Sequence, residues 1–274
     1  MALTINTNMQ SLNSQRALTG SQSSLSTSMA RLSSGLRVNS AKDDAAGLAI
    51  SERMNAQVKG MNVAIRNAND AISMAQTAEG ALGKIGENLQ RMRELAVQAA
   101  NATNGTKDIP AFNKELAELD AENKRIATST QFNGQDILTT AAAGAAMTFQ
   151  VGANSTDTID VTSVDAEAAL TTMAYAALTD GDSARDLMDS IDTAMDTLNS
   201  GRATLGAVQN RFEAVVGNLQ IASENAASAR GRIVDADFAA ETANLSRSQI
   251  LQQAGTAMLA QANQLPQNVL SLLR

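Results

Sequence analysis

The feature that most constrains this fold is a long repeat of apolar and small residues that begins at Leu187. Its members alternate four and three residues apart with no proline among them: Leu187, Ile191, Ala194, Leu198, Gly201, Leu205, Val208, Phe212, Val215, Leu219, Ala222, Ala226, Ala229 and Ile233. A repeat that averages about 3.5 residues places one stripe along a helix, as a left-handed coiled-coil seam requires. At about 1.5 Å per residue, the helix spans roughly 70 Å. One helix cannot bury its own stripe, so another helix must pack against it.

A second long stripe lies in the N-terminal half and is the natural partner, either antiparallel or parallel. One column of this stripe repeats every seven residues: Met54, Met61, Ala68, Ala75, Leu82, Leu89 and Ala96. Its companion column holds Val58, Ile65 and Ile72 and then moves to the other side, with Ala78, Ile85, Met92 and Ala99. The shift predicts contact with more than one partner helix. Gly80, Gly83 and Gly86 lie at the shift, and close approach of a helix explains them better than a hinge does.

The large residues of both stripes are the predicted core of a helical rod. They are Met54, Val58, Met61, Ile65, Ile72, Leu82, Ile85, Leu89, Met92, Leu187, Ile191, Leu198, Leu205, Val208, Phe212, Val215 and Leu219.

Shorter elements connect the two long helices. After a loop at 101–110, residues 111–128 predict a third helix, with Phe112, Leu116, Leu119 and Ile126 on one face. Alternation at Met147, Phe149 and Val151 and at Ile159 and Val161 predicts a short β-hairpin. Two capping boxes mark expected helix starts, at Ser40 with Asp43 and at Ser183 with Asp186. The predicted fold class is therefore mostly α: an elongated antiparallel helical bundle with a small hairpin in the middle.

Composition excludes most chemistry. The chain of 274 residues has no Cys and no His, which removes thiol and imidazole catalysis and the usual zinc sites. Its net charge of -7 argues against nucleic acid and anionic membranes as partners. Asp43 and Asp44 are better explained as helix-capping residues than as a metal or acid-base pair. We expect no enzyme activity, no cofactor and no metal, and we find neither a secretory signal nor a membrane span.

The two ends of the chain are amphipathic yet nearly uncharged. A helix exposed to water usually carries mixed charge on its outer face, so these ends are predicted to pair with each other and with other copies of the chain. Pro266 should kink the C-terminal helix or end its first part. The predicted assembly core is Leu3, Ile5, Met9, Leu12, Leu18, Leu25, Met29, Leu32, Leu36, Leu251, Met258, Leu265, Val269 and Leu272.

Several motifs at both ends resemble those of bacterial flagellin. The N-terminal ones are LSSGLRVNSAKDDAAGLAISERM from Leu32, LQRMRELAVQAAN from Leu89 and TQFNG from Thr130. The C-terminal ones are GAVQNRFE from Gly206, SARGRIVDADFAAET from Ser228 and the closing ANQLPQNVLSLLR. This resemblance covers about residues 1–138 and 184–274.

The resemblance implies a division into parts. Residues 1–40 and 235–274 would form inner-core helices, 41–138 and 184–234 a helical rod, and 139–183 a short variable hairpin region. It also implies a structural filament subunit that works in swimming motility and is secreted through a type III export apparatus into an extracellular flagellum. The implied partners are many copies of itself, an export chaperone, the filament cap and hook-junction proteins.

The resemblance implies one further partner, an innate immune receptor. The positions that match the family's receptor motif are Gln90, Arg91, Leu95, Gln98 and Glu115. Two other functions stay open from the sequence: a hook-filament junction protein with similar ends, and a signalling coiled coil, which would need membrane helices.

Overall fold

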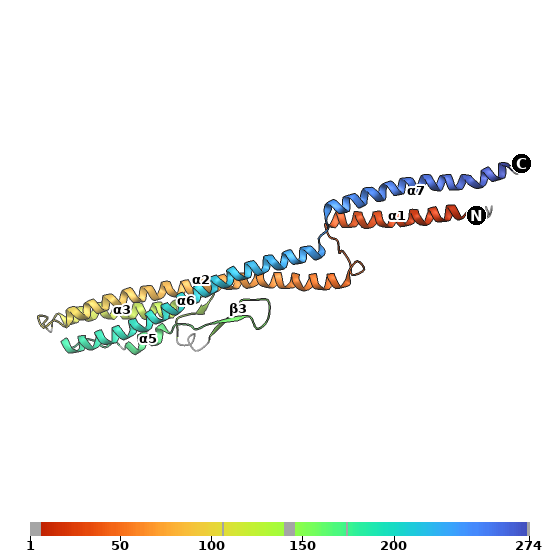
Figure 1. Cartoon of the computed structure of the whole chain (residues 1–274). Coiled ribbons are helices and arrows are strands. Elements are labelled where there is room, and N and C mark those ends of the chain that lie inside the picture. The colour runs from red at the N-terminus through yellow and green to blue at the C-terminus, as the bar shows by residue number, and fades with distance from the viewer. Residues whose placement is uncertain (1–6, 106, 140–145, 174, 273–274) are drawn as a thin grey trace. The chain divides into compact units, whose positions relative to one another are not determined.

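The computed structural model describes residues 7–105, 107–139, 146–173 and 175–272, with side chains described as far as residue 264. The elements are α1 (Met9–Ser34), α2 (Ala45–Ala99), α3 (Ile109–Ser129), β1 (Gln131–Phe132), β2 (Gln135–Asp136), β3 (Met147–Gln150), β4 (Thr158–Val161), α5 (Ala166–Met173), α6 (Gly181–Val234) and α7 (Phe238–Leu272). Figure 1 labels the helices and β3. The mostly helical fold with small antiparallel hairpins confirms the predicted fold class. α7 continues through Pro266, so the expectation that a helix ends there is wrong.

The chain forms two compact units. The terminal unit contains Met1–Ala56 and Asn225–Arg274, and the central unit contains Gln57–Glu224. α2 and α6 contribute to both, and each unit is described by itself below.

The central unit is built on an antiparallel pair of α2 and α6. Asn62 accepts a hydrogen bond from Ser223 at 3.2 Å, and further along α2 Arg93 binds Asp192 at 2.7 Å. Partner numbers fall along α6 as they rise along α2, so the pair is antiparallel. The large side chains of both predicted stripes contribute to one hydrophobic core, in which Met92 also contacts Asn123 of α3. Fully buried among them are Phe212, Leu82, Ile85, Leu89, Met92 and Ile191. Others on the rod-core list are only half-buried: Met54, Val58, Met61, Ile65, Ile72, Val208, Val215 and Leu219.

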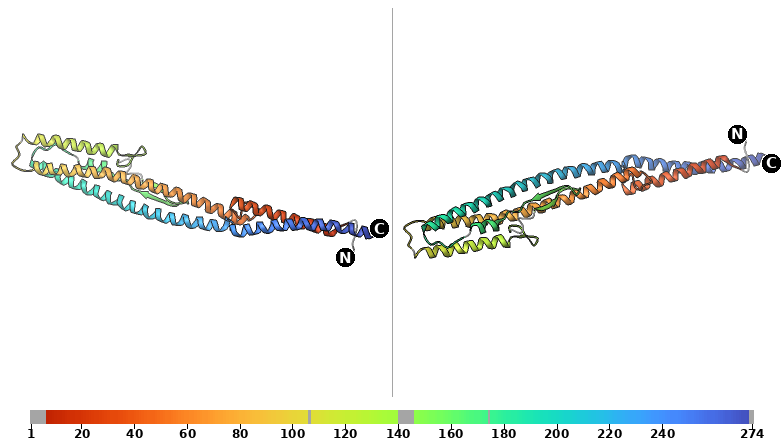
Figure 2. Two further views of the ribbon diagram at one scale, coloured as in Figure 1. Left: turned by 90° about the horizontal axis from the view of Figure 1, so that it is seen from above. Right: turned by 90° about the horizontal axis from the view of Figure 1, so that it is seen from below.

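The third helix, α3, lies beside α2 (Figure 2), and it packs on α2 partly through polar groups. Asn88 of α2 donates to the amide oxygen of Asn123 at 2.8 Å, and Asn123 is fully buried. Leu116 is buried as predicted, but Asp120 lies on the same buried face, where the apolar pattern had pointed to Leu119 and Ile126. The side chains of Leu119 and Ile126 are half-buried. Apolar spacing alone therefore misses the polar part of this interface.

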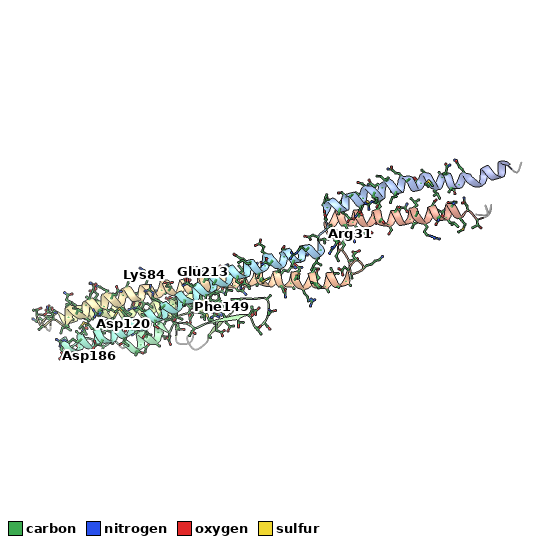
Figure 3. All side chains as sticks on the ribbon, in the orientation of Figure 1. Arg31, Lys84, Asp120, Phe149, Asp186 and Glu213 are labelled. Atoms are coloured by element: carbon green, nitrogen blue, oxygen red, sulfur yellow. The ribbon has the colours of Figure 1, made fainter. Side chains whose placement is uncertain are left out.

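The β3–β4 hairpin packs against the long helices. Met147 pairs with Val161, and Phe149 with Ile159. Phe149, which is labelled in Figure 3, lies on this hairpin. Its ring meets that of Phe212 of α6 edge to face, with the ring centroids 5.7 Å apart. The inward-facing residues are those that the alternation predicts, so the hairpin prediction is confirmed.

The predicted capping boxes are displaced. α2 begins after Asp44, whose carboxylate accepts from the Gly47 amide at 2.8 Å, while Asp43 instead closes a turn by accepting from the Ser40 hydroxyl and amide. These hydrogen bonds lower the pKa of Asp43. α6 begins three residues earlier than predicted. Asp180 accepts from the Ser183 amide, and Ser183 accepts from the Asp180 amide.

The close-approach explanation for the α2 glycines is wrong within the chain. A Cβ atom added at Gly80, Gly83 or Gly86 would meet no atom within 4 Å. The space beside these glycines is open.

The Asp44 cap gives the first prediction. Asp44→Ala should lower the free energy of unfolding by about 1 kcal/mol, because the Gly47 amide loses its acceptor. Urea unfolding followed by circular dichroism measures the change. Asp44→Ser, which keeps a capping oxygen, should retain most of the stability, and equal losses in both variants would contradict the assignment.

The Arg93–Asp192 pair predicts a specific dependence on pH. Hydrogen bonds from Arg93, and then its charge, lower the pKa of Asp192 from its ordinary value of 3.8. The pair therefore adds stability above that ordinary value, and this stability is lost as the pH falls through the lower folded-state pKa. Asp192→Asn should lower the thermal midpoint at pH 7 and flatten its fall as the pH drops below about 4. Asp189→Asn is the matched control, and an unchanged pH profile in Asp192→Asn would refute the pairing.

Candidate assembly surface

The terminal helices α1 and α7 form an antiparallel pair (Figures 1 and 2). At one end, the Asn8 side chain donates to the Ala262 carbonyl and Ser11 donates to the Asn263 side chain, both at 2.8 Å. At the other end, Arg31 lies 3.9 Å from Glu241. The two ends of the sequence are thus brought together, as their shared lack of charge predicted.

The seam between these helices is mostly small and polar. Its buried and half-buried residues alternate three and four apart on both helices: Ser11, Ser14, Leu18, Ser21, Leu25, Ser28 and Leu32 on α1, and Glu241, Leu245, Ser248, Gln252, Gly255, Leu259 and Ala262 on α7. Such side chains let the backbones approach, and Cα atoms of α1 and α7 lie within 8 Å along the pair. Few Cα atoms of α2 and α6, whose seam holds Leu, Ile, Met and Phe, come that close.

The large apolar side chains of this pair are mostly outside its seam. Met258 is 62% exposed and Leu251 is 50% exposed, whereas Gly255 and Ala262 of the same helix lie in the seam. The exposed group comprises Met9, Leu12, Met29, Phe238, Ile250, Leu251 and Met258. We call it the terminal apolar group. Burial of apolar area is the main favourable term in association, and most of these large apolar side chains are not buried within the single chain.

The other predicted assembly residues are placed as follows. Leu18, Leu25, Leu32 and Leu36 are half-buried. Leu3 and Ile5 lie outside the described residues, as do the side chains of Leu265, Val269 and Leu272. Phe238 and Ile250 were missed by the sequence patterns, because neither belongs to the repeating stripe.

A backbone clasp joins the segments that follow α1 and α6. Leu36 pairs with Asp235 in an antiparallel bridge, the Arg37 amide donates to the Val234 carbonyl at 2.6 Å, and the Ala236 amide donates to the Gly35 carbonyl at 3.0 Å. Gly35 has φ 71°, which ends α1 in the left-handed conformation that glycine adopts at low cost. Sequence patterns gave no signal for this pairing beyond the glycine.

A polar hollow of about 620 Å³ lies along one side of the α1–α7 pair. Hydroxyl and small side chains of α1 line one wall, and Asn244, Arg247 and Leu251 line the other. Within the described part of the chain, no cluster of three or more acidic residues could hold a metal ion. None of the described helices is long and apolar enough to cross a membrane.

The positions of the receptor motif lie on α2 and α3. Arg91 binds Glu115 at 2.9 Å, and both are exposed, as are Gln90 and Gln98. Leu95 is only 3% exposed and belongs to the core.

Comparison with known proteins decides the family. A model of the bacterial flagellin N-terminal helical region matches residues 5–143, and one of the C-terminal helical region matches residues 188–273. The chain belongs to the bacterial flagellin family. It is a structural filament subunit, not an enzyme.

Relatives match along nearly their whole length. A flagellin of Halalkalibacterium halodurans is 48% identical over 98% of this chain and 99% of its own, and one of Bacillus subtilis is 41% identical with the same coverage. The flagellar filament 33 kDa core protein of Treponema phagedenis is also 41% identical.

Solved structures agree with the fold. The crystal structure of Bacillus cereus flagellin superposes with a TM-score of 0.52 and 36% identity, over 56% of this chain and 88% of that one. A putative flagellar hook-associated protein from Vibrio parahaemolyticus has a TM-score of 0.57 over 70% of this chain and all of that one. At 14% identity, it shows the fold alone.

The small-residue seam gives a testable prediction. A Cβ added at Gly255 would lie 3.3 Å from Leu18 Cδ1, so the larger Gly255→Val side chain should push α7 away from α1. Hydrogen exchange of the assembled protein should show lower amide protection in α1. Ala254→Val, at an exposed position of the same helix, is the control, and equal protection in both variants would argue against a close seam.

Proposed function

We propose that the terminal apolar group forms the main contact between copies of this flagellin in the filament. The single observation that carries the proposal is the composition of the α1–α7 pair: its seam holds mainly small and polar residues with some half-buried leucines, while the exposed terminal apolar group lies outside the seam. In an isolated α1–α7 helix pair, the large apolar side chains, whose burial would contribute the most free energy, stay exposed to water. Packing many copies side by side removes those side chains from water.

The polar hollow supports the same proposal. Its α1 wall carries Ala17, Gly20, Ser24 and Thr27, so a helix from another copy can approach it closely. Leu251 stands at the edge of the hollow and extends the contact with apolar surface. Hydroxyl groups in the wall offer hydrogen bonds without the cost of burying ions.

The terminal helices are proposed to become fully ordered only in the polymer. Their intrachain seam buries few large apolar side chains, and fixing a helix costs conformational entropy that such a seam offsets weakly. Residues 1–40 and 235–274 would then be the inner-core part, 41–138 and 184–234 the rod, and 139–183 the variable hairpin region.

The remaining partners follow from membership in the family. We propose secretion to an extracellular filament, a chaperone that covers the exposed side chains of α7 before export, and contacts with cap and hook-junction proteins. Recognition by an innate immune receptor would use the exposed Gln90, Arg91, Gln98 and Glu115. Leu95 would support that surface from the core.

A hook-filament junction protein is the competing function within the same fold. Relatives at 41 to 48% identity are named flagellins or a filament core protein, which favours the filament subunit. Seeded polymerisation observed by electron microscopy separates the two, because a filament subunit should grow long fibres alone. Purified protein that stays monomeric with seeds present would refute the filament role.

Met258→Asp tests the proposed contact. Met258 is 62% exposed in the single chain, so the change should leave the thermal melt nearly unchanged. In the polymer, the carboxylate would be buried without a partner, which should abolish elongation from seeds. Gln253→Asp is the control on the same helix, and wild-type elongation by Met258→Asp would remove this residue from the interface.

A further inference from the structure

A second hollow, of about 190 Å³, lies between α2 and α6 in the central unit. We call it the glycine socket. Its lining includes the buried side chains of Leu82 and Leu198 together with Gly83 and Gly86. It is lined by Leu82, Gly83, Gly86, Glu87, Gln90, Met195, Leu198, Asn199 and Arg202.

Two cross-helix polar contacts bound the socket. One heptad before Gly86, Glu79 accepts from Gln209 at 3.0 Å, and one heptad after it, Arg93 binds Asp192 at 2.7 Å. The same column of α2 carries Val58, Ile65 and Ile72 further toward its N-terminus. Gly86 thus occupies a seam position without a side chain. It leaves a gap between the Glu79–Gln209 and Arg93–Asp192 contacts.

Nothing within the chain requires these glycines. Each costs about 1 kcal/mol relative to alanine in a helix interior, and an added Cβ would meet no atom within 4 Å. A gap that costs helix stability without an intrachain contact is explained by a group that enters from outside. Because this chain is a filament subunit, the neighbour that is always present is another copy.

The chain also presents a side chain that fits such a gap. Ile221 is 63% exposed and is the most exposed large apolar residue in the described part of the central unit, ahead of Val63 and Val97. Moving an exposed isoleucine side chain out of water and against leucine side chains lowers the free energy.

The socket and Ile221 lie on opposite flanks of the α2–α6 pair. Arg202, which lines the socket, occupies the same heptad position as Ser223, so both lie on the same flank of α6. Ile221 and Ser223 lie on either side of the seam residue Ala222, which places Ile221 on the other flank. A pocket on one flank and a knob on the other make a heterologous contact, which continues from copy to copy instead of closing as a dimer. At 1.5 Å per residue, the two lie roughly 30 Å apart along α6.

From this arrangement we propose that Ile221 of one copy inserts into the glycine socket of the next. Laterally adjacent copies are then parallel and staggered by roughly 30 Å along the helix axis. The contact adds a second interface, in the central unit, to that of the terminal apolar group. It rests on the proposed assembly function.

Cysteine pairing tests the contact directly, since the natural chain has no cysteine. Filaments are grown from an equal mixture of Ile221→Cys and Gly86→Cys copies and then oxidised. A disulfide forms only when the two Cα atoms come within about 7 Å, so the expected product is a heterodimer linked between these positions, identified by mass spectrometry. Ile221→Cys mixed with Gly80→Cys, and Val63→Cys mixed with Gly86→Cys, are the matched controls.

Filling the socket is the second measurement. Gly86→Leu should raise the critical concentration for polymerisation roughly tenfold, because the blocked contact forfeits the burial of one isoleucine. Its thermal melt should not fall, since leucine favours the helix. Gly80→Leu makes the same exchange outside the socket and should polymerise like the wild type.

The outcomes separate this proposal from the assembly function. If wild-type protein fails to grow on seeds, the assembly function itself is wrong. If filaments grow but the Ile221–Gly86 cross-link is absent, or if Gly86→Leu polymerises at the wild-type critical concentration, the socket contact is overturned and the filament role stands.

Discussion

The antiparallel pairing of α2 and α6 through their apolar seam is the interaction on which the rest of the structure depends. It fixes the two halves of the chain against each other with large side chains such as Leu89 and Phe212. The third helix and the β3–β4 hairpin then pack on a surface that this pair has already formed. Without the seam, neither short element has enough apolar area of its own to stay folded.

Two helix pairs in one chain use the same geometric repeat with opposite chemistry. In the central unit the repeat holds large apolar residues, so the pair is stable by itself. In the terminal unit it holds mostly small and polar residues with a few half-buried leucines, so the helices come close but gain less from burial. The first arrangement suits a rigid body, and the second suits a surface whose stability depends on neighbours.

Much of this could be predicted from the sequence, because periodicity reports burial directly. The seam from Leu187, its partner stripe and the Phe149 hairpin were all readable in that way. The helix starts were misplaced because Ser40 and Ser183 satisfy a capping motif, while the structure uses Asp44, which lies after Ser40, and Asp180, which lies before Ser183. The polar face of α3 was invisible because a buried Asn123 depends on a partner 35 positions away in sequence.

The exposed apolar residues of the terminal helices could be predicted only in part from the sequence. Their spacing identifies Leu251 and Met258, but spacing cannot tell whether a column faces the partner helix or stands beside it. Small residues indicate which side faces the partner, since Gly255 lies in the seam, where an added Cβ would come 3.3 Å from Leu18 Cδ1.

The clasp between Leu36 and Asp235 has a consequence for how copies exchange. In a polymer of identical chains, α1 of one copy could pair with α7 of another, and such swapping would interlink the subunits. A backbone bridge at the base of the terminal helices keeps both helices with their own chain. Each subunit is then topologically independent and joins or leaves the polymer whole.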